Sequence, residues 1–281
     1  MSLFRSIAIF SALMSFARPV LAESNDIILG FGGEADSASG RAAALFADVG
    51  VFDATWLSAT IAGTRTGGFS GGLQTLYADL GFDHWFDPIG FRVGGGYWGD
   101  DDLLDSNDLR GSVYFRNSKT TVSIDYEWRD FDFTIANDLL PAPRVFEFSS
   151  DGYGLSTRFK LSDAVSLSLG GMTYEYSRNI NLQPNIDVLR RFSTSRLSLM
   201  NSLLDYRLTA SIDRSFGPRT ISFVLEQWQT AIDQGTVNSL GAGLLTPIGN
   251  LSDLEFRLSY DQSDDFGSTL TLSAFFYFFG I

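Results

Sequence analysis

The sequence contains no cysteine and only one histidine in 281 residues. The missing cysteines exclude a disulfide scaffold, a thiolate metal site and a cysteine nucleophile, and a single histidine excludes a metal site built from several imidazoles. Basic residues are also scarce, with 20 Lys+Arg against 33 Asp+Glu, so the net charge is −13. This charge argues against nucleic acid as a main partner. We expect neither a cofactor nor a bound metal.

The chain has no apolar stretch of about 18 residues, the length that a transmembrane helix needs. Residues 1–22 begin with a basic Arg5 and continue with a mostly apolar stretch that is too short to span a bilayer. Val20-Leu21-Ala22 then places small or modest residues before a potential cleavage point. We predict a secretory signal peptide over residues 1–22, and the alternative is an N-terminal membrane anchor.

Residues 23–281 alternate between apolar and polar side chains with a period of two. In residues 254–261 every even position is apolar and every odd position is polar, and residues 122–129, 153–161 and 204–213 repeat the pattern. Runs of about ten such residues between turns are typical of transmembrane β-strands. The sequence therefore predicts an all-β protein with an antiparallel transmembrane β-barrel over residues 23–281.

A soluble antiparallel sandwich is the rival fold, because its strands alternate as well. Large aromatic residues such as Tyr126, Trp128 and Tyr260 end the apolar faces here, as the aromatic girdle of a membrane barrel requires. The polar faces carry full charges, and no second apolar set remains to form a soluble core. Both features favour the membrane barrel.

The last residues, 270–281, alternate Leu270, Leu272 and aromatic residues and end in Phe278-Phe279-Gly280-Ile281. This ending resembles the terminal strand of Gram-negative outer-membrane proteins, although that family usually ends on Phe or Trp. The resemblance implies a location in the bacterial outer membrane, contact with its lipid and lipopolysaccharide, and recognition by the barrel-assembly machinery.

Alternation and turn residues together predict about fourteen strands, with twelve as the alternative because the first two are the least certain. The expected strands are 26–34, 41–49, 53–64, 73–84, 90–98, 108–117, 120–130, 152–162, 165–177, 203–214, 219–230, 236–246, 253–261 and 268–280. An even number places both termini in the periplasm, with short turns there and longer acidic loops such as 100–108, 131–151 and 179–202 outside.

Hairpin register can be predicted wherever the turn is short. Centring the turn on residues 87–88 places Asp83 opposite Arg92, and centring the next hairpin near residues 118–119 places Arg110 opposite Glu127. In the same way, a turn at residues 217–218 places Arg207 opposite Trp228. Polar residues meet on one face in these hairpins, as the pleat demands.

The polar faces would form the lumen of the barrel. The charged side chains predicted to line it are Asp79, Asp83, Arg92, Arg110, Arg116, Asp125, Glu127, Arg129, Arg158, Lys160, Asp205, Arg207, Glu226, Glu255 and Arg257. Such charges either set a field across a pore or form a structural ladder of salt bridges. Phe131 and Phe133 would line a mouth if their loop extends the wall, and otherwise they pack together above the membrane.

These patterns predict a channel for passive diffusion of small hydrophilic solutes or ions, and the acidic loops suggest a preference for cations. In size and strand count the chain resembles monomeric fourteen-strand porins, which implies a monomer. The alternative is a narrow or plugged barrel with a structural, adhesive or export role. We do not expect an enzyme: His84 lies beside a short turn among aromatic residues, where we interpret it as an interfacial residue.

Overall fold

The computed structural model describes residues 26–65, 74–100, 104–135, 144–178, 203–231, 234–263 and 267–280. Their strands are β1 (Ile27–Asp36), β2 (Arg41–Phe52), β3 (Thr55–Arg65), β4 (Gln74–Phe86), β5 (Ile89–Asp100), β6 (Leu104–Arg116), β7 (Thr120–Ile135), β8 (Arg144–Lys160), β9 (Val165–Tyr176), β10 (Leu204–Phe216), β11 (Arg219–Thr230), β12 (Thr236–Pro247), β13 (Ser252–Ser263) and β14 (Gly267–Gly280). No helix in these ranges is long and apolar enough to span a bilayer.

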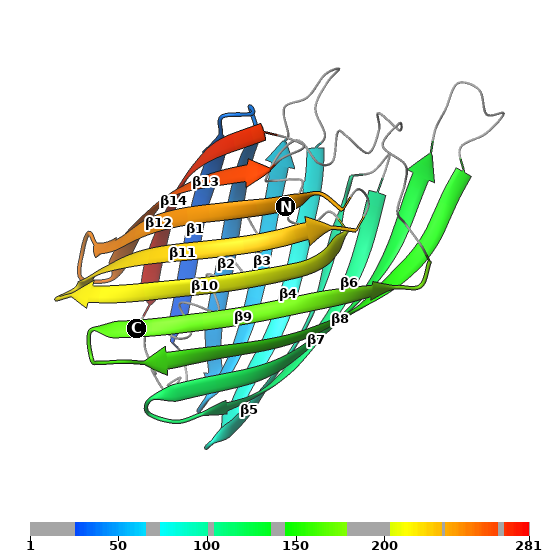
Figure 1. The fold of residues 1–281 in the computed structure, drawn as a ribbon. Coiled ribbons are helices and arrows are strands. Elements are labelled where there is room, and N and C mark those ends of the chain that lie inside the picture. Colours follow the sequence, from blue (N-terminus) through cyan, green and yellow to red (C-terminus); the bar gives the residue numbers. More distant parts are fainter. Residues whose placement is uncertain are drawn as a thin grey trace.

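The strands form one closed antiparallel barrel in which each strand pairs with its neighbours in sequence and β1 pairs with β14 (Figure 1). The β1–β14 seam pairs ten residues of each strand, from Ile27 opposite Gly280 to Asp36 opposite Thr271. Closure leaves no unpaired strand edge, which is the condition for a β-structure in lipid. The predicted all-β barrel and its fourteen strands are confirmed, and the alternative of twelve strands is wrong.

Side chains on the outer surface are predominantly apolar. Leu80, Ile124 and Leu45 have 68%, 68% and 60% of their surface exposed on this face, and their strand neighbours point inward and are more buried. The predicted girdle residues Tyr126, Trp128 and Tyr260 are exposed as well. Because such a surface would be unfavourable in water, it is the face that lipid covers.

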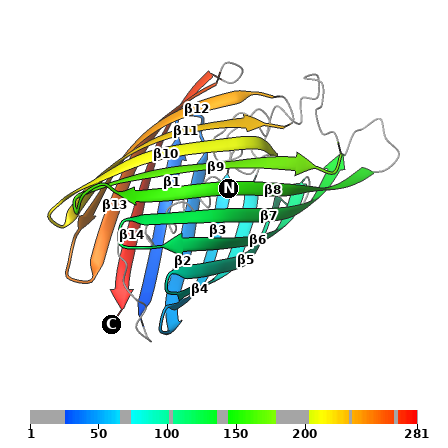
Figure 2. The ribbon, with the colours of Figure 1, turned by 60° about the horizontal axis from the view of Figure 1, so that its bottom comes forward.

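The two ends of the barrel differ in their connections. At one end the strands are joined by short turns, such as residues 87–88 and 217–218, and this end also holds the start of β1 and the end of β14 (Figure 2). At the other end β7 and β8, with 16 and 17 residues, rise above their neighbours (Figure 1). β7 and β8 shorten the expected loop 131–151, and β5 and β6, which end at Asp100 and begin at Leu104, shorten the expected loop 100–108.

These extensions correct three expectations about the connections. Asp105 belongs to β6 rather than to an acidic loop, and residues 50–52, which were expected to connect the strands 41–49 and 53–64, belong to β2. Phe131 and Phe133 belong to the wall, on β7. Residues 50–52 and 104–108 do not alternate, and in residues 131–133 the apolar side chains change to the inner face. The aspartates at residues 100–108 and the prolines near residue 141 also gave these segments the composition of loops.

Candidate functional site: the inner wall of the barrel

The inner wall is formed by every second residue of each strand, and hairpin register sets which of them meet. Asp83 lies opposite Arg92, and Arg110 lies opposite Glu127. Arg207 lies opposite Trp228. These pairs are as predicted, because short turns leave little freedom to shift the register.

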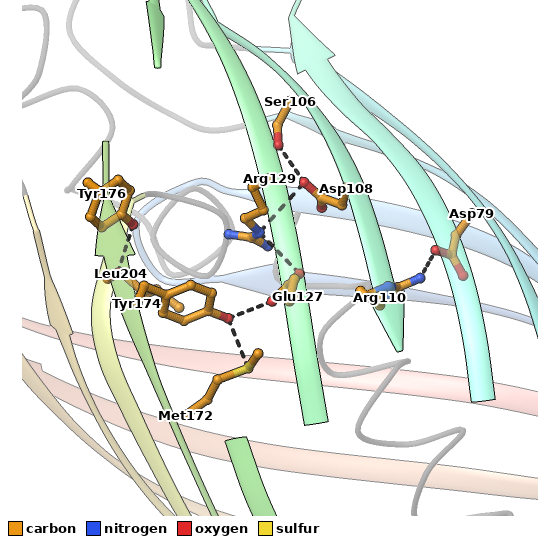
Figure 3. Close-up of polar contacts among 10 residues, drawn as sticks. All are labelled: Asp79, Ser106, Asp108, Arg110, Glu127, Arg129, Met172, Tyr174, Tyr176 and Leu204. Carbon is orange, nitrogen blue, oxygen red and sulfur yellow. Dashed lines mark hydrogen bonds and ion pairs between the residues drawn. The ribbon is translucent and has the colours of Figure 1, made fainter. Parts of the chain in front are cut away.

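Register alone does not give the ion pairs, because long side chains reach past the neighbouring strand. Arg110 on β6 crosses β5 and forms an ion pair with Asp79 on β4 (Figure 3). The crossing is possible because the inward residues of β5 at this point are Gly94 and Gly96, where added Cβ atoms would lie 3.4 Å from Arg110 Nη2 and 3.0 Å from Asp79 Oδ2. The run Gly94-Gly95-Gly96 thus leaves room for a salt bridge over the strand.

A cluster of buried charges lies on β6 and β7 and includes Arg129, the most buried charged residue of the described chain (Figure 3). Arg129 has 2% of its surface exposed. Its Nε atom lies 3.1 Å from Oε1 of Glu127 and 3.6 Å from Oδ1 of Asp108. Ser106 donates a hydrogen bond to Asp108 at 2.5 Å, and Tyr174 on β9 donates one to Glu127 at 2.7 Å. Two carboxylates around one guanidinium leave this cluster with one negative charge.

A second cluster lies nearer the short turns, on β4 to β6. Arg92 forms an ion pair with Asp83, and the hydroxyl of Tyr114 donates to the other oxygen of Asp83 at 2.6 Å. Tyr114 reaches Asp83 across β5 at Gly90, which lies directly opposite Tyr114. Both oxygens of Asp83 therefore have partners inside this cluster.

The rest of the wall carries further pairs of the same kind. Arg158 on β8 reaches Asp213 on β10 at 3.4 Å, and Ser166 on the strand between them contacts both side chains. Arg207 lies 2.7 Å from Glu226. The remaining contacts are Arg257 to Glu255 at 3.5 Å, Tyr277 to Glu255 at 3.2 Å and Ser123 to Asp125 at 2.7 Å.

Three predicted wall residues stand apart from these pairs. Asp205 lies at a β-bulge between Leu204 and Tyr206, outside the paired inward row. Lys160 lies at the end of β8, half exposed, and its ammonium is 2.9 Å from Asp163 in the turn, where the hydrogen bond lowers the pKa of Asp163. Arg116 faces inward at the end of β6, over the rings of Trp85 and Tyr114.

The wall also contains a buried apolar cluster, of which only Phe131 and Phe133 were expected to line the lumen. Phe131 and Phe148 stack with ring centroids 5.0 Å apart, and Trp98, Leu104 and Phe133 belong to the same buried cluster. The phenylalanines thus face inward, as expected if the loop extends the wall, and also pack together. The alternation at residues 130–133 is inverted, with the apolar residues inward, so the pattern gave no sign that these rings lie on the inner wall.

Charge is unevenly distributed around the wall. The inward acids on β4 to β9 are balanced by five arginines and Lys160, whereas β10 to β14 and β1 to β3 carry more acids than bases. The inward acids of that second part include Glu34, Asp36, Asp48, Asp213, Glu226, Asp253, Glu255 and Asp261, and its inward bases are Arg207 and Arg257. One part of the lumen wall is therefore acidic.

His84 lies on the outer face of β4. Its Nδ1 atom is 2.6 Å from the hydroxyl of Thr55. Its ring meets the ring of Phe86 edge-on, with ring centroids 4.1 Å apart. No group of three or more potential metal-binding side chains occurs in the described part of the chain. The histidine is thus part of an aromatic cluster on the outer wall.

Together the closed barrel, the apolar outer face and the charged inner wall define a transmembrane β-barrel protein. Neither a protein-family model nor a curated protein matches the sequence. Among solved structures, a bacterial polysaccharide outer membrane secretin is 10% identical with a TM-score of 0.51, covering 91% of this chain and 99% of that chain. At this identity the likeness shows the fold alone.

Two further solved structures are similar at lower scores. A KdgM porin is 10% identical with a TM-score of 0.43, covering 88% of this chain and 97% of its own. A loop-deletion mutant of OmpT, an outer membrane protein of Vibrio cholerae, is 8% identical with a TM-score of 0.48, covering 91% and 100%.

Proposed function

We propose that the chain is a porin-like channel of the bacterial outer membrane for passive diffusion of small hydrophilic solutes. The observation that carries the proposal is the division of the barrel into an apolar outer face and an inner wall of charges and hydroxyls. Fourteen strands exceed the eight whose interior is filled by side chains alone and approach the sixteen that leave an aqueous channel. Under this proposal the termini and short turns face the periplasm.

The acidic part of the wall supports a preference for cations. Carboxylates outnumber arginines there, and a surplus of one sign in a low-dielectric channel raises the local concentration of the opposite ion. Membrane lipid, lipopolysaccharide and the barrel-assembly machinery are the proposed partners, the last through β14. We propose a monomer without enzymatic activity, cofactor or metal, secreted by means of residues 1–22.

A narrow barrel with a structural, adhesive or export role is the second candidate. The burial of Glu127 and Arg129, with 5% and 2% of their surface exposed, favours it, because these charges satisfy each other. In this alternative the salt bridges stabilise a polar interior and conduct nothing.

Single-channel recording of the refolded mature chain in a planar bilayer separates the two candidates. Stable current steps with a reversal potential that favours cations in a salt gradient are the expected result. A barrel that shifts on a gel when heated, and is therefore folded, but never conducts would exclude the channel and leave the second candidate.

A further inference from the structure

Six inward arginines form ion pairs with carboxylates of the wall, whereas Arg116 does not. The paired residues are Arg92 with Asp83, Arg110 with Asp79, Arg129 with Glu127 and Asp108, Arg158 with Asp213, Arg207 with Glu226, and Arg257 with Glu255. Arg116 faces the same lumen, but no carboxylate among the described residues lies within ion-pair distance of it. Its positive charge is not neutralised by the wall.

Arg116 is held by aromatic rings instead. Its guanidinium carbon lies 5.6 Å from the ring centroid of Trp85 and 5.2 Å from that of Tyr114. A guanidinium over aromatic rings is attracted through its face, while its N–H groups point outward in its own plane. Neither contact is a hydrogen bond to an oxygen, so these contacts leave the N–H groups of Arg116 available as donors.

Trp85 adds a second donor with no acceptor. Its Nε1 atom is buried and has no hydrogen-bond partner, which costs free energy unless a ligand supplies an acceptor. The nearest candidate acceptor on the same strand is Asp83, but its two oxygens already accept from Arg92 and Tyr114. Arg116 and the buried Nε1 atom of Trp85 are therefore two kinds of donor without an acceptor among the described residues, at the end of the lumen near the short turns.

We propose that Arg116 and Trp85 form a binding subsite for the carboxylate group of a small solute. A carboxylate has two coplanar oxygens that match the planar fork of a guanidinium, and its remaining lone pairs can accept from an indole N–H. One uncompensated positive charge matches a monoanion, whereas a phosphate monoester carries about −1.5 to −2 at neutral pH. The inference rests on the proposed passage of solutes through the lumen. It adds a class of solute that binds at β4 and β6, outside the acidic part of the wall that supports the preference for cations.

Binding can be tested without conduction, by NMR of the ¹⁵N-labelled full barrel refolded in detergent micelles. The chain has five tryptophans, and Trp85→Phe identifies the indole signal of Trp85 by its loss. The probes are sodium propionate, its neutral amide propionamide, and sodium chloride at equal ionic strength. We expect a saturable shift of the Trp85 signal with propionate only.

Variants of the arginines show which side chain binds. Arg116→Gln should weaken propionate binding about tenfold or more, the scale of one lost charge-assisted hydrogen bond, and Arg116→Lys should restore part of it. Arg214→Gln is the matched control, because Arg214 lies over Phe216 at 4.7 Å in an exposed position on the outer face. This control should leave binding unchanged.

Three results would overturn the subsite: no propionate shift in a folded barrel, an equal shift with chloride or propionamide, or an unchanged affinity in Arg116→Gln. Far-ultraviolet circular dichroism and heat-dependent gel migration establish that each variant is folded. Parallel bilayer recordings separate this inference from the channel proposal. A conducting barrel that does not bind propionate refutes only the subsite, and a binding barrel that never conducts refutes only the channel.

Discussion

The phenol ring of Tyr114 on β6 covers Gly90 on β5, its directly opposed partner, and occupies the position that a Cβ atom at residue 90 would take. The same relationship joins Gly152 with Tyr174, Gly30 with Phe46, and Gly32 with Phe275, all on the inner wall. Two of these rings continue to a carboxylate two strands away: Tyr114 to Asp83 and Tyr174 to Glu127. Glycine is thus the residue that lets a ring cross a strand.

Substituting this glycine tests the relationship. Gly90→Ala should destabilise the barrel by about 1–3 kcal/mol, because the added methyl group displaces the Tyr114 ring. The matched control is Gly63→Ala on β3, where a Cβ atom meets nothing within 4 Å, and its effect should stay within about 0.5 kcal/mol. Urea unfolding in lipid vesicles, followed by tryptophan fluorescence, measures both. Equal effects of the two substitutions would refute the close packing at Gly90.

The cluster around Arg129 predicts a large loss of stability when its cation is removed. Arg129→Met leaves Glu127 and Asp108 buried without their counter-ion and should cost about 3–5 kcal/mol. The double variant Glu127→Gln/Arg129→Met should recover part of this loss, since it removes one of the two carboxylates. Arg214→Met, an exposed substitution on the outer face, is the control in the same urea experiment. A loss as small as that of the control would show that the buried pairing contributes little.

Like charges oppose each other on the outer face of the raised strands. Asp132 on β7 lies directly opposite Asp105 on one side and Glu147 on the other. Asp132→Asn should therefore stabilise the barrel by a few tenths to about 1 kcal/mol at low salt, and the gain should shrink at high salt as screening increases. Unfolding curves at two ionic strengths provide the measurement. A gain that is independent of salt would point to a cause other than charge repulsion.

The acidic part of the wall predicts how ion selectivity responds to substitution. Asp48 lies on the inward face of β2 in that part of the wall. Asp48→Asn removes one negative charge from the lumen, so the reversal potential should move toward that of a non-selective pore. Asp130→Asn, on the outward face of β7, serves as the control in the same bilayer recordings. An equal change in both variants would contradict the assignment of Asp48 to the conducting path.

Much of the barrel could be predicted because its strands are specified locally. Alternation with a period of two marks which residues share a face, and short turns set the register, so the pairing of Asp83 with Arg92 and of Arg110 with Glu127 follows from the sequence. The boundaries near residues 104 and 131 could not be predicted, because residues 104–108 do not alternate and Phe131 and Phe133 place apolar side chains on the face that carries polar residues in the rest of β7. The placement of Asp205 was also inaccessible, since a bulge leaves no mark in the alternation.

The sequence by itself thus determined the fold class, a count of about fourteen strands and the face on which most of the charged residues lie, because these depend on neighbouring residues. Only the tertiary structure decided the ion pairs of Arg110 with Asp79 and of Arg158 with Asp213, which lie 31 and 55 residues apart and span a strand between them. It also decided that Arg116 has aromatic rather than acidic partners. These contacts depend on the direction of each long side chain and on the space that the intervening strand leaves, and neither is encoded in alternation.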